Sequence, residues 1–99
     1  MKNVPDSTEE ERYHFILFIA GMSGKSVIAV ENLRQICDQY LNERCDIEIV
    51  DLNRDAHLAT VHQIIAVPTL IKTGPMPTRT ILGDLSDTSK VLRILEIKH

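Results

Sequence analysis

The stretch that decides the fold runs from Ile64 to Asp87 and reads IIAVPTLIKTGPMPTRTILGDLSD. It holds an apolar approach to Val67-Pro68-Thr69, β-prone runs at 69–72 and 78–82, and the turn TGPMP between those runs. A proline cannot donate to a β-ladder, so Pro68 marks a turn or the start of a strand. The turn is short enough for a hairpin, which predicts an antiparallel pair of strands after Pro68.

Upstream of this stretch the pattern is strand, helix, strand. Residues 13–20, YHFILFIA, are aromatic and β-branched with almost no polar break, which predicts a central strand buried on both faces. Apolar residues at helical spacing then predict an amphipathic helix over 25–42, with Ser23 as its N-cap. Residues 46–52, DIEIVDL, form a second predicted strand, and the long connection implies parallel pairing through a right-handed crossover.

Two further helices complete the predicted order. Asp55 is expected to cap a short helix, and Ser86 or Asp84 to open the last one. The short helix carries Leu58, Val61 and Ile65, and the last helical pattern carries Val91, Leu92, Ile94, Leu95 and Ile97. Three of those last five residues are β-branched and would also serve in a strand, but the spacing favours a helix packed on a sheet.

The resulting α/β order, β-α-β followed by α-β-β-α around a mixed sheet, resembles the thioredoxin fold. Members of that fold keep a cis-proline ahead of the third strand. The resemblance implies a cis bond between Val67 and Pro68, facing the loop after the first strand. In thioredoxin-like enzymes that loop holds the reactive cysteines, whereas residues 20–26 read AGMSGKS and contain no thiol.

Composition indicates one small domain and limits its partners. The chain has 99 residues, which we divide into a mobile acidic tail at 1–11 and one domain at 12–99. The net charge of −3 argues against binding to duplex nucleic acid, which needs a basic surface. No apolar run approaches the roughly 20 residues that cross a bilayer, and no signal peptide is apparent, so we expect a cytoplasmic protein.

No catalytic, metal or cofactor site emerges from the remaining residues. The two cysteines, Cys37 and Cys45, form no CxxC pair, and Cys37 is expected to be a buried thiol on the helix. Gly24-Lys25-Ser26 lacks the first glycine of a P-loop, which leaves Lys25 as a solvated helix-start cation. His57 and His62 lie five residues apart, a spacing that does not bring two ligands together on a helix. Asp84 and Asp87 are better explained as helix caps than as paired catalytic carboxylates.

Several motifs together resemble the circadian clock KaiB family. They are LFIAG at 17–21, IVDL at 49–52, AVPTL at 66–70, PMP at 75–77 and above all ILGDLSD at 81–87. The resemblance implies a non-enzymatic regulator, without cofactor, that binds a KaiC-type ATPase and modulates its phosphorylation or signalling in a circadian or stress-adaptation role. It also implies competition with a histidine kinase that carries a KaiB-like domain, possible dimers or tetramers, and a second, fold-switched ground state.

The chain departs from the family pattern at positions that bear on binding. Relatives usually carry two adjacent basic residues before IIGD, and here only Arg79 matches; Ile94 stands where a glycine is common. The candidate partner interface is Lys25, Arg79, Asp84 and Asp87. Two other functions stay open: a thioredoxin-like redox domain that uses Cys37 or Cys45, and a sensory domain that docks on a histidine kinase.

Overall fold

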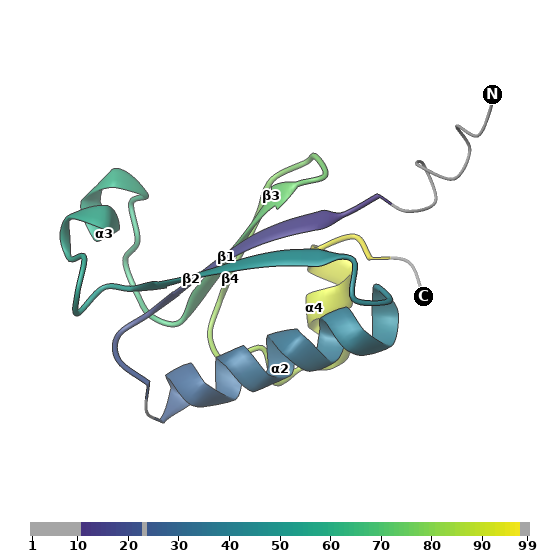
Figure 1. The fold of residues 1–99 in the computed structure, drawn as a ribbon, viewed down its shortest axis with the longest axis horizontal. Coiled ribbons are helices and arrows are strands. Elements are labelled where there is room, and N and C mark those ends of the chain that lie inside the picture. The colour runs from purple at the N-terminus through teal and green to yellow at the C-terminus, as the bar shows by residue number, and fades with distance from the viewer. Residues whose placement is uncertain (1–10, 23, 98–99) are drawn as a thin grey trace.

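A computed structural model describes residues 11–22 and 24–97 of the chain, and Figure 1 shows their arrangement. The elements are β1 (Tyr13–Ile19), α2 (Lys25–Tyr40), β2 (Cys45–Asp51), α3 (His57–Val61), β3 (Thr69–Gly74), β4 (Arg79–Leu82) and α4 (Thr88–Ile94). This order confirms the predicted β-α-β-α-β-β-α sequence. The expected N-cap Ser23 and residues 1–10 of the expected tail lie outside the described residues.

The four strands form one mixed sheet in the order β2-β1-β3-β4. β1 pairs in parallel with β2 and antiparallel with β3, and β3 pairs antiparallel with β4. The predicted central position of 13–20 and the predicted hairpin after Pro68 are therefore both confirmed. The parallel pair requires the α2 crossover, because its two strands run in the same direction.

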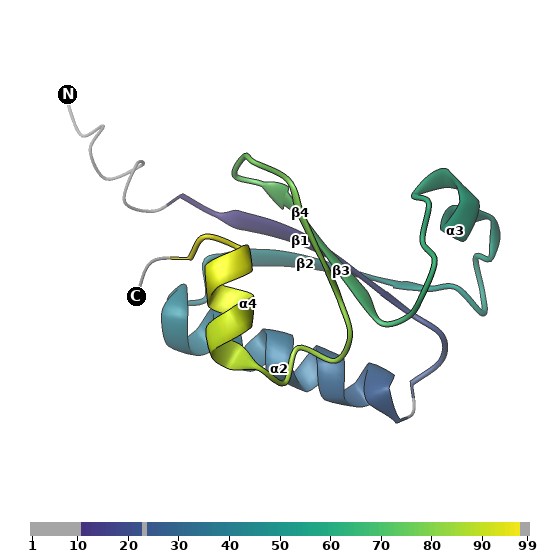
Figure 2. The same cartoon turned by 180° about the vertical axis from the view of Figure 1, so that it is seen from behind.

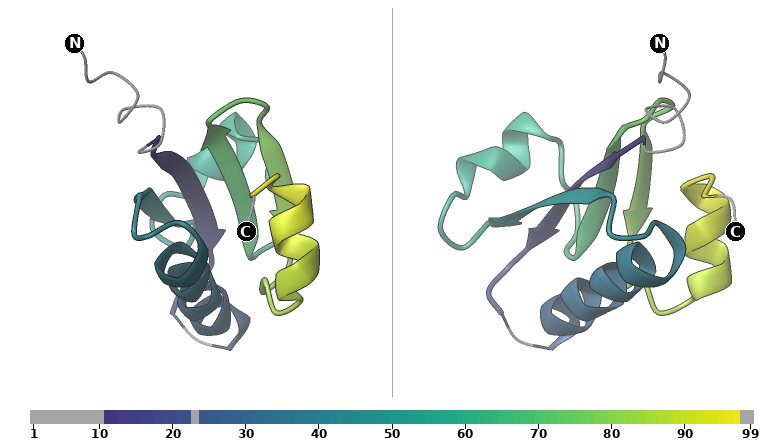
Figure 3. Two further views of the ribbon diagram at one scale, coloured as in Figure 1. Left: turned by 90° about the vertical axis from the view of Figure 1, so that its right-hand side faces the viewer. Right: turned by 45° about the vertical axis from the view of Figure 1, so that its right-hand side comes forward.

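Helices α2 and α4 cover the same face of the sheet, as the opposite views in Figures 1 and 2 show. The core lies between them and that face. It includes Phe15 and Leu17 of β1, Leu33 and Ile36 of α2, and Leu92 of α4, none of them more than 2% exposed. The side view in Figure 3 shows the two helices next to each other on one side of the strands.

The other face of the sheet is only partly covered. Phe18 faces this side and is fully buried, with the His62 ring at 5.0 Å between centroids. Ile16, two residues earlier on the same face, is half-buried. The short helix α3 lies beyond the end of the sheet, away from α2 and α4 (Figure 1). The prediction that β1 is buried on both faces therefore holds at Phe18 but only in part at Ile16.

The last segment is a helix, as its spacing predicts, and of its expected caps Asp87 is confirmed whereas Ser86 and Asp84 are wrong. Asp87 is the N-cap of α4, and its carboxylate accepts a hydrogen bond from the Lys90 N–H at 3.2 Å. Asp84 instead accepts from the Ser86 N–H at 3.1 Å, inside the connection that precedes the helix. An aspartate two residues before a free N–H forms such a local turn readily, so Asp84 and Ser86 shape the approach to the helix rather than its start.

The prediction for α3 is also wrong in detail. Its N-cap is Ala56, with no side-chain hydrogen bond, so Asp55 does not cap the helix. The helix buries no residue, and Val61 and Ile65 are 66% and 86% exposed. The apolar spacing there therefore does not mark a buried face.

A lysine lies inside the core beneath α4. Lys72 is only 2% exposed, and its Nζ donates to the Leu95 carbonyl at 2.9 Å, at the C-terminal end of α4. The Tyr13 ring lies 5.8 Å from the same nitrogen. Loss of water around the ammonium lowers the pKa of Lys72, and the carbonyl at the negative end of the helix partly compensates for that loss.

Candidate functional site

Pro68 stands at the end of the sheet where β1 and β2 finish and β3 begins. The Val67–Pro68 bond is cis, as the resemblance to the thioredoxin fold implies. Thr69 pairs with Phe18 on one side and with Leu82 on the other. The Gly83 N–H donates to the Pro68 carbonyl at 2.9 Å, and the Thr69 hydroxyl donates to the Ala66 carbonyl at 2.6 Å. The proline is thereby fixed next to the end of β1.

The loop that follows β1 is tied to the end of β2 by one carboxylate. Asp51 Oδ1 accepts from the Gly21 N–H at 3.0 Å and from the Asn53 N–H at 2.9 Å. These two hydrogen bonds favour the carboxylate and hold the pKa of Asp51 below its usual value. Gly21 has a φ of +75°, and a Cβ there would meet the Asn53 amide nitrogen at 3.2 Å, so the position requires glycine.

This loop lies where thioredoxin-like enzymes keep their reactive cysteines, and its described residues contain none. The described part of the chain has no free cysteine at all. No group of three or more His, Cys, Asp or Glu side chains within the described ranges could hold a metal ion. His62 packs on Phe18 and His57 is exposed on α3. The geometry around Pro68 therefore offers a shaped surface without a nucleophile.

The same end of the sheet exposes apolar side chains. Met22 of the loop is 58% exposed, Val67 before the cis bond is 40% exposed, and Leu82 at the end of β4 is 55% exposed. We call these three residues, together with Pro68, the Pro68 end. Apolar side chains gathered at one end of a small domain are typical of a surface that a partner covers.

The predicted interface residues fall at two separate places. Lys25 begins α2 and is exposed, and its charge contributes to lowering the pKa of Asp84, after the larger effect of the hydrogen bonds from Ser86. The Asp84 carbonyl accepts from the Asn32 amide of α2 at 2.8 Å, so the connection 83–87 is held against that helix. Lys25 and Asp84 thus border the Pro68 end, and Asp87 lies nearby as the cap of α4.

Arg79 lies apart from these residues, at the opposite end of β4. Its guanidinium forms an ion pair with Glu96 at 2.6 Å, and both side chains are roughly half-exposed. The two residues meet because α4 returns along β4 and brings its C-terminal end back to the start of the strand (Figure 2). Any role of Arg79 in binding therefore involves a residue that already has an acidic partner.

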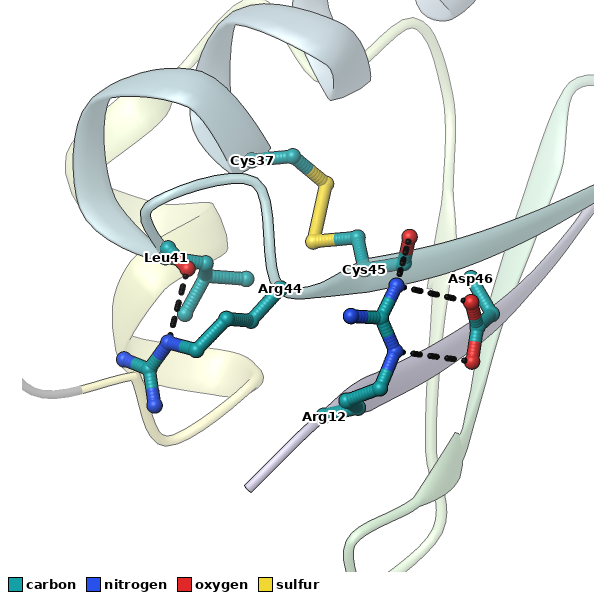
Figure 4. The surroundings of a disulfide bond; sticks show 6 residues. All are labelled: Arg12, Cys37, Leu41, Arg44, Cys45 and Asp46. Atoms are coloured by element: carbon teal, nitrogen blue, oxygen red, sulfur yellow. Dashed lines mark hydrogen bonds and ion pairs between the residues drawn. A yellow bond between two sulfur atoms is a disulfide. The ribbon is translucent and has the colours of Figure 1, made fainter. Parts of the chain in front are cut away.

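The sequence analysis missed the disulfide between the two cysteines. Cys37 of α2 and Cys45, the first residue of β2, are joined by a disulfide, with their Cα atoms 6.1 Å apart (Figure 4). Cys37 is buried as expected, but it is not a free thiol. The pairing depends on the turn between α2 and β2, where the Glu43 N–H donates to the Cys37 carbonyl at 2.9 Å, and no sequence motif reports it. The one available signal is their separation of 8 residues across a single helix-to-strand turn.

The fold and the thiol-free loop define a thioredoxin-like domain that lacks the dithiol site of the thioredoxins. The KaiB domain family matches residues 16–97, and the chain belongs to that family. The circadian clock protein KaiB3 of Synechocystis sp. is 40% identical over 81 residues, which cover 82% of this chain and 79% of that protein. The circadian clock oscillator protein KaiB of Gloeothece citriformis is 36% identical, covering 94% and 88%.

Solved structures support the fold independently. The N-terminal domain of SasA from Synechococcus elongatus superposes with a TM-score of 0.68 at 18% identity, covering 86% of this chain and 84% of that one. Mitochondrial thioredoxin 3 of Saccharomyces cerevisiae gives 0.67 at 16% identity, covering 98% and 92%. At these identities the likeness establishes the thioredoxin-like fold. Family membership, with the curated clock relatives, gives the chain a regulatory role of the circadian clock type.

None of the helices among the described residues is long and apolar enough to span a membrane.

Proposed function

We propose that this chain is a non-enzymatic, cytoplasmic regulator that binds a KaiC-type ATPase and modulates its phosphorylation or signalling, in a circadian or stress-adaptation role. The observation that carries the proposal is the Pro68 end of a KaiB-family domain. It has the position of a thioredoxin active site, no thiol, and three exposed apolar side chains. A domain of this kind acts through what it binds, because the described residues of the Pro68 end include no thiol and no metal-binding group.

The Pro68 end suits a protein partner because its apolar and charged residues lie next to each other. Burial of Met22, Val67 and Leu82 would supply the apolar centre of an interface. Lys25 is exposed and Asp84 is half-exposed, and both charges lie at the margin of that apolar centre. An apolar centre with a polar rim is the usual anatomy of a protein interface.

We propose that the chain has the thioredoxin-like form both when it is free and when it binds its partner. Ile94 lies in α4 where relatives commonly have glycine, and it packs against the core. A helix gains up to about 1 kcal/mol when glycine is replaced, so the substitution favours the helical form over a fold-switched ground state. Hydrogen exchange that shows α4 protected together with the sheet, in one slow phase, is the expected result; a second slowly exchanging state would contradict it.

Arg79 lies at the other end of β4, so it tests whether the contact with the partner extends beyond the Pro68 end, and its ion pair with Glu96 allows a matched control. In size-exclusion chromatography with a KaiC homologue, we expect wild type to co-elute and Arg79→Glu to lose binding. Arg79→Glu with Glu96→Arg keeps an ion pair but reverses the charge at position 79. Loss of binding in both variants would assign Arg79 to the interface, whereas recovery in the double variant would show that the pair itself matters.

The alternative partner is a histidine kinase that the chain would dock on without any ATPase. The likeness to the SasA domain is in the fold, so this alternative rests on fold alone. Co-elution with a histidine kinase in the absence of the ATPase homologue, together with no co-elution with that ATPase, would replace the proposed function by this one.

A further inference from the structure

The Cys37–Cys45 disulfide lies at the end of the sheet opposite to Pro68. It joins the C-terminal half of α2 to the first residue of β2 (Figure 4). A hollow of about 500 Å³ opens beside it, lined by both cysteines and by Arg34, Asp38 and Glu43 among others. The disulfide is therefore not enclosed in the core but borders a space that another molecule can enter.

We propose that the Cys37–Cys45 pair is a reversible redox site, reduced by a dithiol protein that attacks the Cys45 sulfur. The proposal rests on the proposed cytoplasmic location but not on binding at the Pro68 end. Disulfides are rare where glutathione and thioredoxin keep thiols reduced, and those that form there are usually transient and redox-sensing. A cysteine pair that can meet in the folded chain next to an open hollow fits that class.

The exposure of the two residues gives the direction of attack. Cys37 is 5% exposed, whereas Cys45 is half-buried. β2 is an edge strand whose only neighbour in the sheet is β1, so one side of Cys45 faces no other strand. An incoming thiolate must align with the sulfur–sulfur bond. Both cysteines line the hollow, and Cys45 is the more exposed of the two, so we infer that the attack falls on its sulfur.

The reduction proceeds in two balanced steps. A thiolate of the reductant bonds to Cys45 Sγ, the sulfur–sulfur bond breaks, and its electron pair leaves on Cys37 Sγ, which takes a proton from water. The second thiolate of the reductant then attacks its own sulfur in the mixed disulfide and releases Cys45 as a thiolate, which is also protonated. Two electrons pass to this chain, which gains two thiols, and the reductant becomes a disulfide.

Arg34 is placed to assist the departure of Cys37. The two residues are three positions apart on α2, which puts their side chains on one face, and both line the hollow. A positive charge favours a thiolate, and a better leaving thiolate accelerates exchange. Asp38 and Glu43 line the same hollow and act in the opposite direction, so the effect of Arg34 is measurable but modest.

Both ends of the disulfide are held by contacts that reduction does not remove. The Arg12 guanidinium donates to the Cys45 carbonyl at 3.2 Å and to the Asp46 carboxylate at 2.9 Å (Figure 4). On the other side, Leu33 and Ile36 anchor α2 in the core and are at most 2% exposed. Reduction therefore frees the helix-to-strand turn while the sheet and α2 stay in place, which is what a reversible site requires.

A thioredoxin whose second active-site cysteine has been replaced is the probe for this proposal, because it stops at the mixed disulfide. With the native full chain, we expect a covalent adduct at Cys45 and a free Cys37 that iodoacetamide alkylates, both located by peptide mass spectrometry. Intact thioredoxin with its reductase should then reduce the pair, and oxidised glutathione should restore it, with an unchanged circular dichroism spectrum in both states.

Variants test the direction and the role of the arginine. Arg34→Gln should slow adduct formation by about threefold, because the leaving Cys37 thiolate loses a nearby positive charge. Arg93→Gln, at an exposed arginine of α4, is the matched control and should leave the rate unchanged. An adduct on Cys37, adduct formation only in urea, or loss of the native spectrum on reduction would overturn the proposal.

Discussion

Reduction of the Cys37–Cys45 disulfide should lower the stability of the domain by a defined amount without unfolding it. The bridge spans a sequence separation of 8 residues. For a loop of that size the chain-entropy relation gives about 2.5 kcal/mol at 25 °C. Domains of this length usually have a free energy of unfolding of about 5–15 kcal/mol, so most of the stability should remain. The same loss corresponds to a melting temperature lower by about 10–20 °C.

The assay is urea unfolding followed by circular dichroism, with and without a dithiol reductant. Wild type should lose about 2.5 kcal/mol when it is reduced, seen as a lower midpoint of unfolding. The variant Cys37→Ala with Cys45→Ala is the control, and the reductant should not affect it. A urea midpoint that the reductant does not change would show that the bridge does not form or does not constrain the unfolded chain. Complete unfolding on reduction would refute the argument that Arg12 and the core hold the two ends.

Three further perturbations test the electrostatics and capping of the fold. Asp87→Ala removes the cap that binds the Lys90 N–H and should cost about 1 kcal/mol in urea unfolding; an unchanged midpoint would mean that the cap is dispensable. Lys72→Met should stabilise the domain by about 1 kcal/mol at neutral pH. Burial lowers the pKa of Lys72 from 10.5, so wild type should regain stability relative to Lys72→Met as the pH rises towards that value. A difference in stability that stays constant with pH would contradict this. Tyr13, whose pKa burial raises, titrates in both proteins and does not affect the comparison. The pKa of Asp51 is held below 3.8, so the stability that its carboxylate contributes is present above that pH and lost below it. The stability advantage of wild type over Asp51→Asn should therefore shrink on acidification. An advantage that grows on acidification would contradict the assignment.

Much of the fold follows from local chemistry that the sequence displays. Pro68 with its flanking β-prone runs predicts the hairpin of β3 and β4, because a proline stops one element and a short turn pairs the next two. The unbroken apolar run of β1 predicts its central place in the sheet. The residue types of the last segment are compatible with a helix or a strand. Its Leu92 and Leu95 side chains are buried in the core, and this packing favours the helix α4.

What the sequence could not give depends on distances set by tertiary structure. The disulfide requires that the turn between α2 and β2 bring the two Cα atoms to 6.1 Å, a distance that the spacing of the cysteines alone does not fix. The apolar spacing around Val61 and Ile65 predicts a buried face, yet a helix buries a face only where another element meets it. The ion pair of Arg79 likewise follows from the path of α4, which brings Glu96 to the arginine.

The central claim is that the Pro68 end binds a KaiC-type ATPase, and native mass spectrometry with a KaiC homologue tests it most directly. Leu82→Glu places a charge in the apolar centre of the Pro68 end. Met76→Glu makes the same change at a residue 76% exposed in the turn between β3 and β4, away from Pro68. We predict complexes with wild type and Met76→Glu and none with Leu82→Glu. The absence of a complex with wild type, or equal binding of Leu82→Glu and wild type, would contradict the account.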